Sequence, residues 1–295
     1  MSADANSAGM RAAALPCWSR PVEPRPLTGG ITNTNFVVED RGERFVVRIG
    51  DDIPVHGVMR FNELAAAKAA AAVGISPPIV YHEPGALVMR YVDGRTLRPR
   101  DLASRPMLSR VLPLLWRCHR EMTRHLQGPL LMFWVFHVIR GYGHTLSKRG
   151  SHHSGALPRL LSIAEELERA IGPITIVFAH NDLLAANFID SGDRLWLIDW
   201  DYAGFNSPLF DLANLASNNG IEGEDETWLV QTYFEGPCDA GLMRRYTAMR
   251  CASLLREAMW SMVSELTSAL DFDYAAYTAE NLGRFERAWA AFEAA

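Results

Sequence analysis

The chain has 295 residues, enough for one large domain or two modest ones with a substantial core. Hydrophobic residues make up 48% of the chain, an ordinary fraction for a globular protein. The formal net charge of -5 gives no basic surface for nucleic acid or an anionic membrane, so we expect neither partner, whereas a cationic substrate is compatible with it.

The four cysteines are widely spaced and form no Cys-x-x-Cys pair, which favours free thiols over disulfides or a zinc site. Residues 1–20 are small and polar without an apolar signal segment, and we expect them to form a flexible tail. The longest apolar stretch, residues 130–139, is too short for a membrane span, which needs about twenty residues. We therefore expect a cytoplasmic protein; its oligomeric state is not set by the sequence.

Residues 26–35 read Pro-Leu-Thr-Gly-Gly-Ile-Thr-Asn-Thr-Asn and lead into a predicted hairpin of strands 35–39 and 44–49. The glycines let backbone amides approach a ligand closely and the polar side chains add donors, so this loop suits phosphate groups. A tight turn alone is the simpler interpretation, but the position upstream of the catalytic residues described below favours nucleotide contact. The expected contacts are Gly29, Gly30, Thr32 and Asn33.

The run Phe45-Val-Val-Arg-Ile49 on the second strand of this hairpin carries one cation, Arg48, among apolar neighbours. In kinase-type phosphoryl transfer, a cation at this place contacts the α- and β-phosphates and pairs with a glutamate on the next helix. Residues 60–73 are rich in alanine and predict that helix, and Glu63 lies in its first turn. We expect an ion pair between Arg48 and Glu63; the alternative is that both charges face solvent.

Residues 79–81 and 86–92 predict another hairpin, around a Pro-Gly turn. Met89 and Tyr91 lie on its second strand and just after it, where the chain would pass behind an adenine ring.

The chain as a whole predicts an α+β protein with two lobes. Residues 21–92 would form a nucleotide-binding lobe built on a small antiparallel sheet, and residues 93–295 a larger, mostly helical catalytic lobe. His152 and His153 fall in a polar segment with no nearby cysteine or carboxylate in the sequence, so we expect a solvated loop and no metal there. Helical periodicity recurs over residues 107–118, 157–171, 228–234, 239–266 and 272–292.

The segment Phe178-Ala-His-Asn-Asp-Leu-Leu-Ala-Ala-Asn187 and the strand at 195–199 carry the densest group of chemically active residues. Asp182 and Asn187 are five residues apart, and a predicted hairpin would fold Asp199 back beside Asn187. In kinase-type transfer, one carboxylate orients the attacking hydroxyl and accepts its proton, while an Asn and a second Asp hold magnesium. We therefore expect Asp182 to be the catalytic base and Asn187 and Asp199 to bind Mg²⁺, with ATP as the phosphate donor.

His180-Asn-Asp182 with Asn187, followed by Ile198-Asp-Trp-Asp-Tyr-Ala-Gly-Phe-Asn-Ser-Pro-Leu-Phe-Asp-Leu-Ala-Asn214, resembles the choline/ethanolamine kinase family. That family belongs to the aminoglycoside-phosphotransferase-like small-molecule kinases. Protein kinases usually read His-Arg-Asp and Asp-Phe-Gly at these places, whereas this chain has Asn181 and Asp-Trp-Asp. The difference points away from a protein substrate.

The resemblance covers residues 28–280 and implies a protein-kinase-like fold. It implies that the Gly-Gly-Ile-Thr-Asn stretch is the nucleotide loop and that Arg48 stands where protein kinases have lysine. It also implies that Asp211 supports the catalytic loop.

An ammonium group is bound by aromatic faces and carboxylates. The resemblance implies that Tyr202 belongs to the acceptor pocket, with Asp201 beside it as a second negative group. The family segment that aligns with residues 256–260 bears two tryptophans; here Trp260 is present and Glu257 replaces the other. Two tyrosines further along are candidates either for the pocket wall or for the core: Tyr274 and Tyr277.

The leading interpretation is an ATP- and magnesium-dependent kinase that phosphorylates the hydroxyl of a small amino-alcohol, with choline as the first candidate. Glu257 and Leu184, which stand where the family has other residues, leave ethanolamine, thiamine, a sugar or an aminoglycoside open as acceptors. A catalytically silent nucleotide-binding scaffold is a third interpretation. Such scaffolds usually lack a magnesium ligand or the catalytic Asp, and this chain keeps all three residues.

Overall fold

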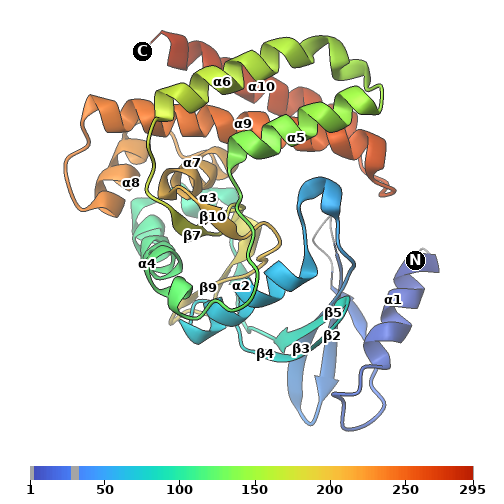
Figure 1. The fold of residues 1–295 in the computed structure, drawn as a ribbon. Helices are drawn as coiled ribbons and strands as arrows, with labels where there is room; N and C mark the ends of the chain where they lie inside the picture. Colours follow the sequence, from blue (N-terminus) through green and yellow to red (C-terminus); the bar gives the residue numbers. More distant parts are fainter. Residues whose placement is uncertain (1–2, 28–32, 295) are drawn as a thin grey trace.

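A computed structural model describes residues 3–27 and 33–294, in which a small lobe built on a sheet meets a larger helical lobe (Figure 1). The strands of the small lobe are β1 (Arg25–Leu27), β2 (Thr34–Asp40), β3 (Glu43–Ile49), β4 (Ile79–Glu83) and β5 (Ala86–Arg90). They form an antiparallel sheet in the order β1-β2-β3-β5-β4. Both hairpins predicted for this region are therefore present, and β3 is the central strand.

One face of the sheet is covered by α1 (Ala3–Ala13), a helix that the sequence analysis did not predict. Ala12 and Leu15 are buried and belong to the same small core as Phe36 and its neighbours on the strands. The expectation of a flexible tail over residues 1–20 was wrong for the described part of that segment. The physical reason is that an apolar sheet face must be covered, and this segment provides the cover.

The other face of the sheet lies against α2 (Arg60–Ala72), close to the helix predicted over 60–73. Side chains alternate between the two faces of a strand, so Arg48 points away from the α1 side, to which Val47 belongs. Four alanines of α2 are buried and pack with residues of the large lobe in one core: Ala66, Ala67, Ala69 and Ala70. This packing brings Glu63, in the first turn of α2, to Arg48.

The large lobe is mostly helical. Its helices are α3 (Pro99–Leu102), α4 (Arg105–Glu121), α5 (Val135–Lys148), α6 (Leu157–Ile171), α7 (Pro208–Asn219), α8 (Glu224–Phe234), α9 (Ala240–Thr267) and α10 (Tyr274–Glu293). The 28-residue α9 is the central helix, because α5, α6, α7 and α10 all pack against it (Figure 1). Among residues 3–27 and 33–294, no helix combines the length and the apolar character that a membrane span requires.

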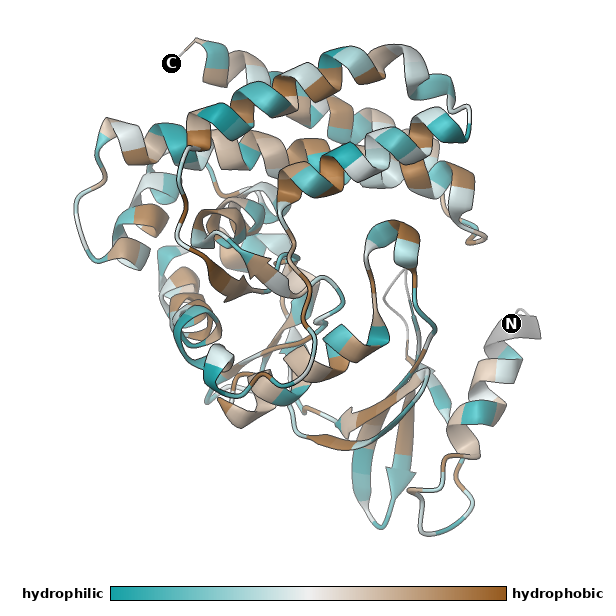
Figure 2. Cartoon of the chain, in the orientation of Figure 1, coloured by the Kyte–Doolittle hydropathy of each residue, from teal (hydrophilic) through white to brown (hydrophobic). Residues whose placement is uncertain are grey.

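Two short sheets in the large lobe position the candidate site. β7 (Val177–Ala179), which is mainly hydrophobic in Figure 2, pairs with β10 (Gly204–Asn206). The second sheet contains β6 (Arg95–Thr96), β8 (Phe188–Asp190) and β9 (Leu195–Leu197). β8 and β9 form the predicted hairpin, and Ile198 N–H donates to the carbonyl of Asn187 at 2.9 Å. This register brings Asp199 next to Asn187.

The packing of the N-terminal segment can be tested with Leu15→Ala. Leu15 is 4% exposed, and truncation of a buried leucine costs about 2–5 kcal/mol. We expect chemical denaturation to show a loss in the free energy of unfolding at the low end of that range. Met10→Ala is the matched control, because Met10 is 63% exposed, and its effect should stay within about 0.5 kcal/mol. Equal stabilities of the two variants would contradict the packing.

Candidate active site

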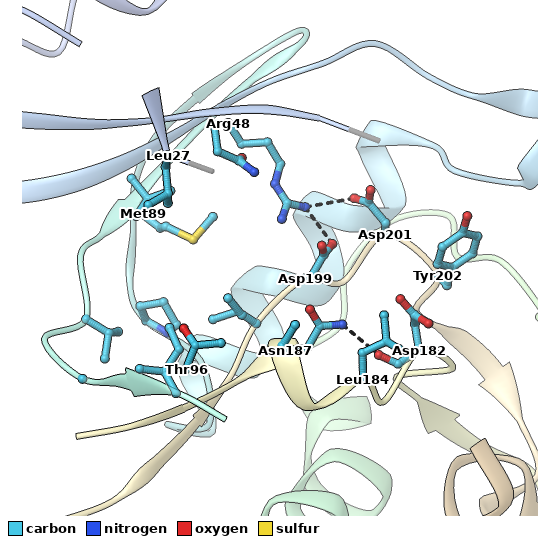
Figure 3. Close-up of a pocket in the computed structure, with 18 of the residues that line it drawn as sticks. Leu27, Arg48, Met89, Thr96, Asp182, Leu184, Asn187, Asp199, Asp201 and Tyr202 are labelled. Atoms are coloured by element: carbon cyan, nitrogen blue, oxygen red, sulfur yellow. Dashed lines mark hydrogen bonds and ion pairs between the residues drawn. The ribbon is translucent and has the colours of Figure 1, made fainter. Parts of the chain in front are cut away.

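A pocket of about 490 Å³ is lined by residues of both lobes and contains most of the residues selected from the sequence (Figure 3). Its apolar end is lined by Leu27, Val46, Pro77 and Met89. Its charged middle contains Arg48, Asp182, Asn187 and Asp199. Its aromatic end is lined by Tyr202, Trp260 and Tyr277 together with Glu257. From one end to the other, the pocket therefore offers an apolar, a charged and an aromatic environment.

Residues 180–187 connect β7 to β8 and end in a short 3-10 helix at Ala185–Asn187. We call this segment the catalytic loop after the role expected for Asp182. Asn181 has a left-handed backbone with φ of 67°, a conformation that asparagine tolerates better than most residues. Its side chain is held from two sides: Nδ2 donates to the Tyr202 carbonyl at 3.0 Å, and Oδ1 accepts from Asn206 at 2.9 Å. These contacts fix the turn that presents the following residue, Asp182.

Asp211 of α7 holds the backbone of the catalytic loop by hydrogen bonds. Its fully buried carboxylate accepts the backbone N–H groups of His180 at 2.9 Å and Asn181 at 2.7 Å, and His119 lies 2.8 Å away. Burial alone would raise the pKa of Asp211, but the hydrogen bond and charge of His119 outweigh it and lower the pKa. The His180 ring donates from Nε2 to the Ile198 carbonyl at 3.0 Å, and burial lowers its pKa. His180 therefore braces the loop as a neutral side chain.

Two asparagines of α7 complete this support, and the sequence analysis missed both. Asn214 Oδ1 accepts from Leu183 N–H at 2.6 Å, and Asn219 Oδ1 accepts from Ala185 N–H at 2.9 Å. Both side chains are buried. The available signal was a set of amide side chains within a largely apolar helix, because such groups are buried only with hydrogen-bond partners.

Asp182 lies between the charged middle and the aromatic end, near Tyr202 (Figure 3). Its side chain is 17% exposed. Burial raises the pKa of Asp182 to about 7; the negative charge of Glu257 acts in the same direction and the positive charge of Arg256 opposes it. A carboxyl group with a pKa near neutrality suits proton acceptance, because it is substantially ionised and still basic.

Asn187 and Asp199 place oxygen atoms on the same side of the pocket. Asn187 Nδ2 donates to the Asp182 carbonyl at 2.9 Å, which leaves its amide oxygen turned toward Asp199 (Figure 3). Asp199 has a left-handed backbone with φ of 68°, and its carboxylate is 3.0 Å from Arg48. A carboxylate and an amide oxygen are donors of the kind that Mg²⁺ binds. This donor set fits the ion expected from the sequence.

Arg48 is 7% exposed and holds three carboxylates with a single nitrogen. Its Nη1 lies 2.7 Å from Glu63, 3.0 Å from Asp199 and 3.0 Å from Asp201. The expected Arg48–Glu63 ion pair is thus present and buried, so the solvent-facing alternative was wrong. The Nε of Arg48 is buried without a hydrogen-bond partner in the part of the chain that the structure describes. An unused guanidinium donor beside a pocket fits a phosphate oxygen.

Asp201 faces the same group of cations. It is 3% exposed and accepts from Arg60 Nη1 at 2.8 Å and from Asn33 Nδ2 at 2.9 Å, in addition to Arg48. This carboxylate is turned toward two guanidinium groups and also lines the pocket, so its expected contact with the acceptor stays a prediction. Arg60, which the sequence analysis did not select, also binds Glu63 at 2.6 Å.

The structure describes only some of the residues that were expected to contact the nucleotide. Gly29, Gly30 and Thr32 lie outside the described residues. Met89 and Tyr91 both line the pocket, so the structure brings them to the position expected for a ligand contact.

The aromatic end combines ring faces with one carboxylate. Trp260 Nε1 donates to the hydroxyl oxygen of Tyr202 at 2.9 Å, which fixes the two rings relative to each other. Glu257 accepts from the Tyr277 hydroxyl at 2.8 Å and pairs with Arg256 at 2.9 Å. Aromatic faces beside a carboxylate form a site suited to an organic cation.

Tyr274 does not line this pocket, which corrects its expected role as a substrate contact. It is the first residue of α10, and its ring packs on Trp260 at 6.0 Å. Residues three apart on a helix are neighbours on one face, and the next in that row, Tyr277, is the one that reaches the pocket. Tyr274 is therefore a core residue, whereas Tyr277 forms part of the pocket wall.

Arg256 was also missed by the sequence analysis. Its side chain is 2% exposed, 2.9 Å from Glu257 and 3.9 Å from Asp182, and it lies 5.4 Å from the Tyr202 ring centroid. A buried cation is costly unless it is paired. Its positive charge beside Asp182 therefore favours the ionised form of that carboxyl group.

His152 and His153 lie in a short 3-10 helix at His152–Ala156 and have a carboxylate neighbour that the sequence did not indicate. Glu265 of α9, 112 residues after His153, lies 3.2 Å from its Nε2. The three side chains offer possible metal-ligating atoms within 4.8 Å of one another. They do not line the pocket. The sequence did not indicate this carboxylate because it comes from a distant helix, and the expectation that no metal binds here stays a prediction.

Comparison with known proteins adds independent findings. The family model described as choline/ethanolamine kinase matches residues 25–233. Protein LicA of Haemophilus influenzae is 28% identical over 214 residues, which cover 70% of this chain and 61% of LicA, so less than two thirds of that relative is spanned. Ethanolamine kinase 2 of Homo sapiens is 27% identical over 296 residues, covering 89% of this chain and 75% of that protein. The solved structure of a choline/ethanolamine kinase family protein from Mesorhizobium loti has a TM-score of 0.77 at 26% identity and covers 98% of this chain and 99% of that one.

The support of the catalytic loop by α7 can be tested with Asn214→Ala. The change leaves the Leu183 N–H buried without its acceptor, and such a loss costs about 1–3 kcal/mol in the free energy of unfolding. Asn218→Ala is the control, because Asn218 is on the same helix, is only half-buried, and donates its hydrogen bond to Asn214 itself. Urea unfolding should show a clearly smaller loss for the control. A larger loss for Asn218→Ala would contradict the assignment.

Proposed function

The chain belongs to the choline/ethanolamine kinase family, and from this premise we propose that it transfers the γ-phosphate of ATP to the hydroxyl of an amino-alcohol, with choline as the leading acceptor. The observation that carries the proposal is the convergence of Asp182, Asn187 and Asp199 beside Arg48 in one pocket. Kinase-type transfer requires a proton acceptor, metal ligands and a phosphate-binding cation. These four side chains can fill all three roles.

At the donor end, the apolar lining around Met89 suits the adenine ring of ATP, and the unused donor of Arg48 suits its phosphates. Asn187 and Asp199 would hold Mg²⁺, which when bound neutralises charge on the transferring phosphoryl group. Arg48 keeps Asp199 oriented through the 3.0 Å contact.

At the centre, Asp182 orients the acceptor hydroxyl and takes its proton as the new oxygen–phosphorus bond forms and ADP departs. The buried pair of Arg256 and Glu257 sets the balance of charge around it. Burial raises the pKa of Asp182 to about 7, while Arg256 favours the ionised form and Glu257 disfavours it.

At the acceptor end, the faces of Tyr202, Trp260 and Tyr277 suit the methyl groups of a quaternary ammonium. Ethanolamine is the second candidate, and Glu257 is the observation that favours it. A primary ammonium carries N–H donors that a carboxylate can accept, whereas choline has none. An acceptor without a cationic group, such as a sugar, would not use the affinity of these aromatic faces for a cation.

The location that we propose is the cytoplasm. All four cysteines are free thiols in the structure, which agrees with a reducing compartment.

A panel of acceptors tests the proposal. Choline, ethanolamine, thiamine, glucose and an aminoglycoside are each supplied with ATP and Mg²⁺, and ADP release is measured by a coupled assay. We expect turnover with choline or ethanolamine and background rates with glucose, because the sugar lacks a cation. Comparable kcat/KM for glucose would contradict the acceptor site. Absence of turnover with every acceptor would favour a nucleotide-binding scaffold.

The role of Asp182 predicts a large loss in Asp182→Ala. Positioned proton transfer contributes about 10²–10⁴-fold to a rate, so kcat should fall by that factor while the melting temperature stays close to that of the wild type. Asp193→Ala is the control, because Asp193 is an exposed carboxylate in the nearby β8–β9 turn. Near-normal turnover of Asp182→Ala would remove it as the base.

The raised pKa of Asp182 predicts the pH dependence. The proton acceptor must be ionised, so kcat/KM for the acceptor should rise with pH through about 7, the value to which burial raises the pKa of Asp182. Glu257→Gln removes a negative charge that raises this pKa, so the acidic limb should move to lower pH. Initial rates between pH 5 and 9 measure both profiles. A limb that moves to higher pH in Glu257→Gln would contradict the electrostatic account.

A further inference from the structure

The connection between β3 and α2, residues 50–59, reaches from the small lobe to the large lobe (Figure 1). It has a defined backbone: Ile53 and Val58 face each other and exchange two hydrogen bonds, of 2.8 and 3.2 Å. Gly57 closes the turn with a left-handed φ of 73°, a conformation that glycine adopts readily. We call this segment the 50–59 loop.

His56 lies in the short helix at Pro54–His56 of this loop and is 8% exposed. Its ring contacts two helices of the large lobe. Nδ1 is 3.2 Å from the hydroxyl of Tyr142 on α5, and Nε2 is 3.2 Å from the hydroxyl of Ser264 on α9. The same ring packs on Trp260, with ring centroids 5.3 Å apart and planes 36° from parallel.

The hydrogen bonds around His56 define one neutral form of the ring. Ser264 Oγ donates to the Trp260 carbonyl at 2.9 Å, so it accepts from Nε2–H of His56. Nδ1 then accepts from the Tyr142 hydroxyl, and both ring nitrogens are satisfied. Burial and the charge of Arg256 lower the pKa of His56 to about 4, so the ring stays neutral near physiological pH.

The base of the 50–59 loop is tied to the charged middle of the pocket. Asp52 accepts from the backbone N–H of Arg60 at 2.7 Å, and Arg60 Nε donates to the Asp51 carbonyl at 2.9 Å. The same guanidinium binds Asp201 at 2.8 Å. The loop therefore connects the group around Arg48 at one end with the aromatic end of the pocket at the other.

We propose that His56 is a positioning residue for the acceptor, through which the small lobe fixes the ring of Trp260. Trp260 is held on its indole edge by Tyr202 and on a ring face by His56. Without the imidazole, that side of the indole loses its packing partner and Ser264 loses a donor. The inference rests on the proposed function, because it takes Trp260 as a wall of the acceptor site.

Kinetics of His56→Leu test this role, since leucine keeps the bulk and removes both hydrogen bonds. The expected result is an acceptor KM raised about tenfold with the KM for ATP within about twofold, since misplacing a binding group weakens the substrate that it contacts. His56→Gln, which keeps a donor and an acceptor, should recover most of the acceptor affinity. Ser264→Ala is the milder second variant, should His56→Leu fail to fold. His137→Leu is the control, because His137 is exposed on α5.

Hydrogen exchange provides a second readout that does not depend on turnover. Amides of residues 260–264 in α9 should exchange faster in His56→Leu than in the wild type or in His137→Leu. If the wild type phosphorylates no amino-alcohol, the proposed function fails while this measurement still tests the contact. Unchanged acceptor KM together with unchanged exchange would overturn the inference. Equal increases in both KM values would also overturn it, because they would indicate a general structural defect.

Discussion

The structure depends on the burial of Arg48 among carboxylates at the junction of the lobes. Glu63, Asp199 and Asp201 all lie within 3.0 Å of its Nη1, and such a group of acids would repel one another without a cation. Arg60 provides the second guanidinium, so two positive charges face three negative ones. One negative charge is left over, in a pocket that also contains Asp182. That excess is suited to a divalent cation, and the same contacts hold the small lobe in place over the large one.

The second constraint is that α7 must satisfy the backbone N–H groups of the catalytic loop. Its backbone N–H groups cannot bond to a sheet partner, and α7 satisfies them with buried side chains: Asp211 for two of them, Asn214 and Asn219 for one each. A buried polar network of this kind holds its shape because every broken contact leaves an unsatisfied group. The left-handed backbone of Asn181 persists for the same reason. Asp182 is consequently presented by a rigid loop rather than a mobile one.

The sequence predicted local features well. The hairpins and the helix over 157–171 are confirmed, because turn residues and periodicity encode them within short windows. The protein-kinase-like fold, which the family resemblance implied, is confirmed as well. Features that depend on distant partners were missed. The N-terminal helix is stabilised by packing on a face of the sheet. The role of Arg256 becomes recognisable only from its position beside Asp182. The role of His56 becomes recognisable only from its contact with α9. Tyr274 and Tyr277 differ only in their place on α10, which no pattern in the sequence sets.

The central claim is that Asp182, Asn187 and Asp199 surround one phosphoryl-transfer site. A crystal structure with a non-hydrolysable ATP analogue, Mg²⁺ and choline or ethanolamine tests it directly. The account predicts magnesium about 2.0–2.1 Å from oxygens of Asn187 and Asp199. It also predicts the acceptor hydroxyl about 2.6–3.2 Å from Asp182. A nucleotide and metal bound away from these three residues, or a hydroxyl out of reach of Asp182, would contradict it.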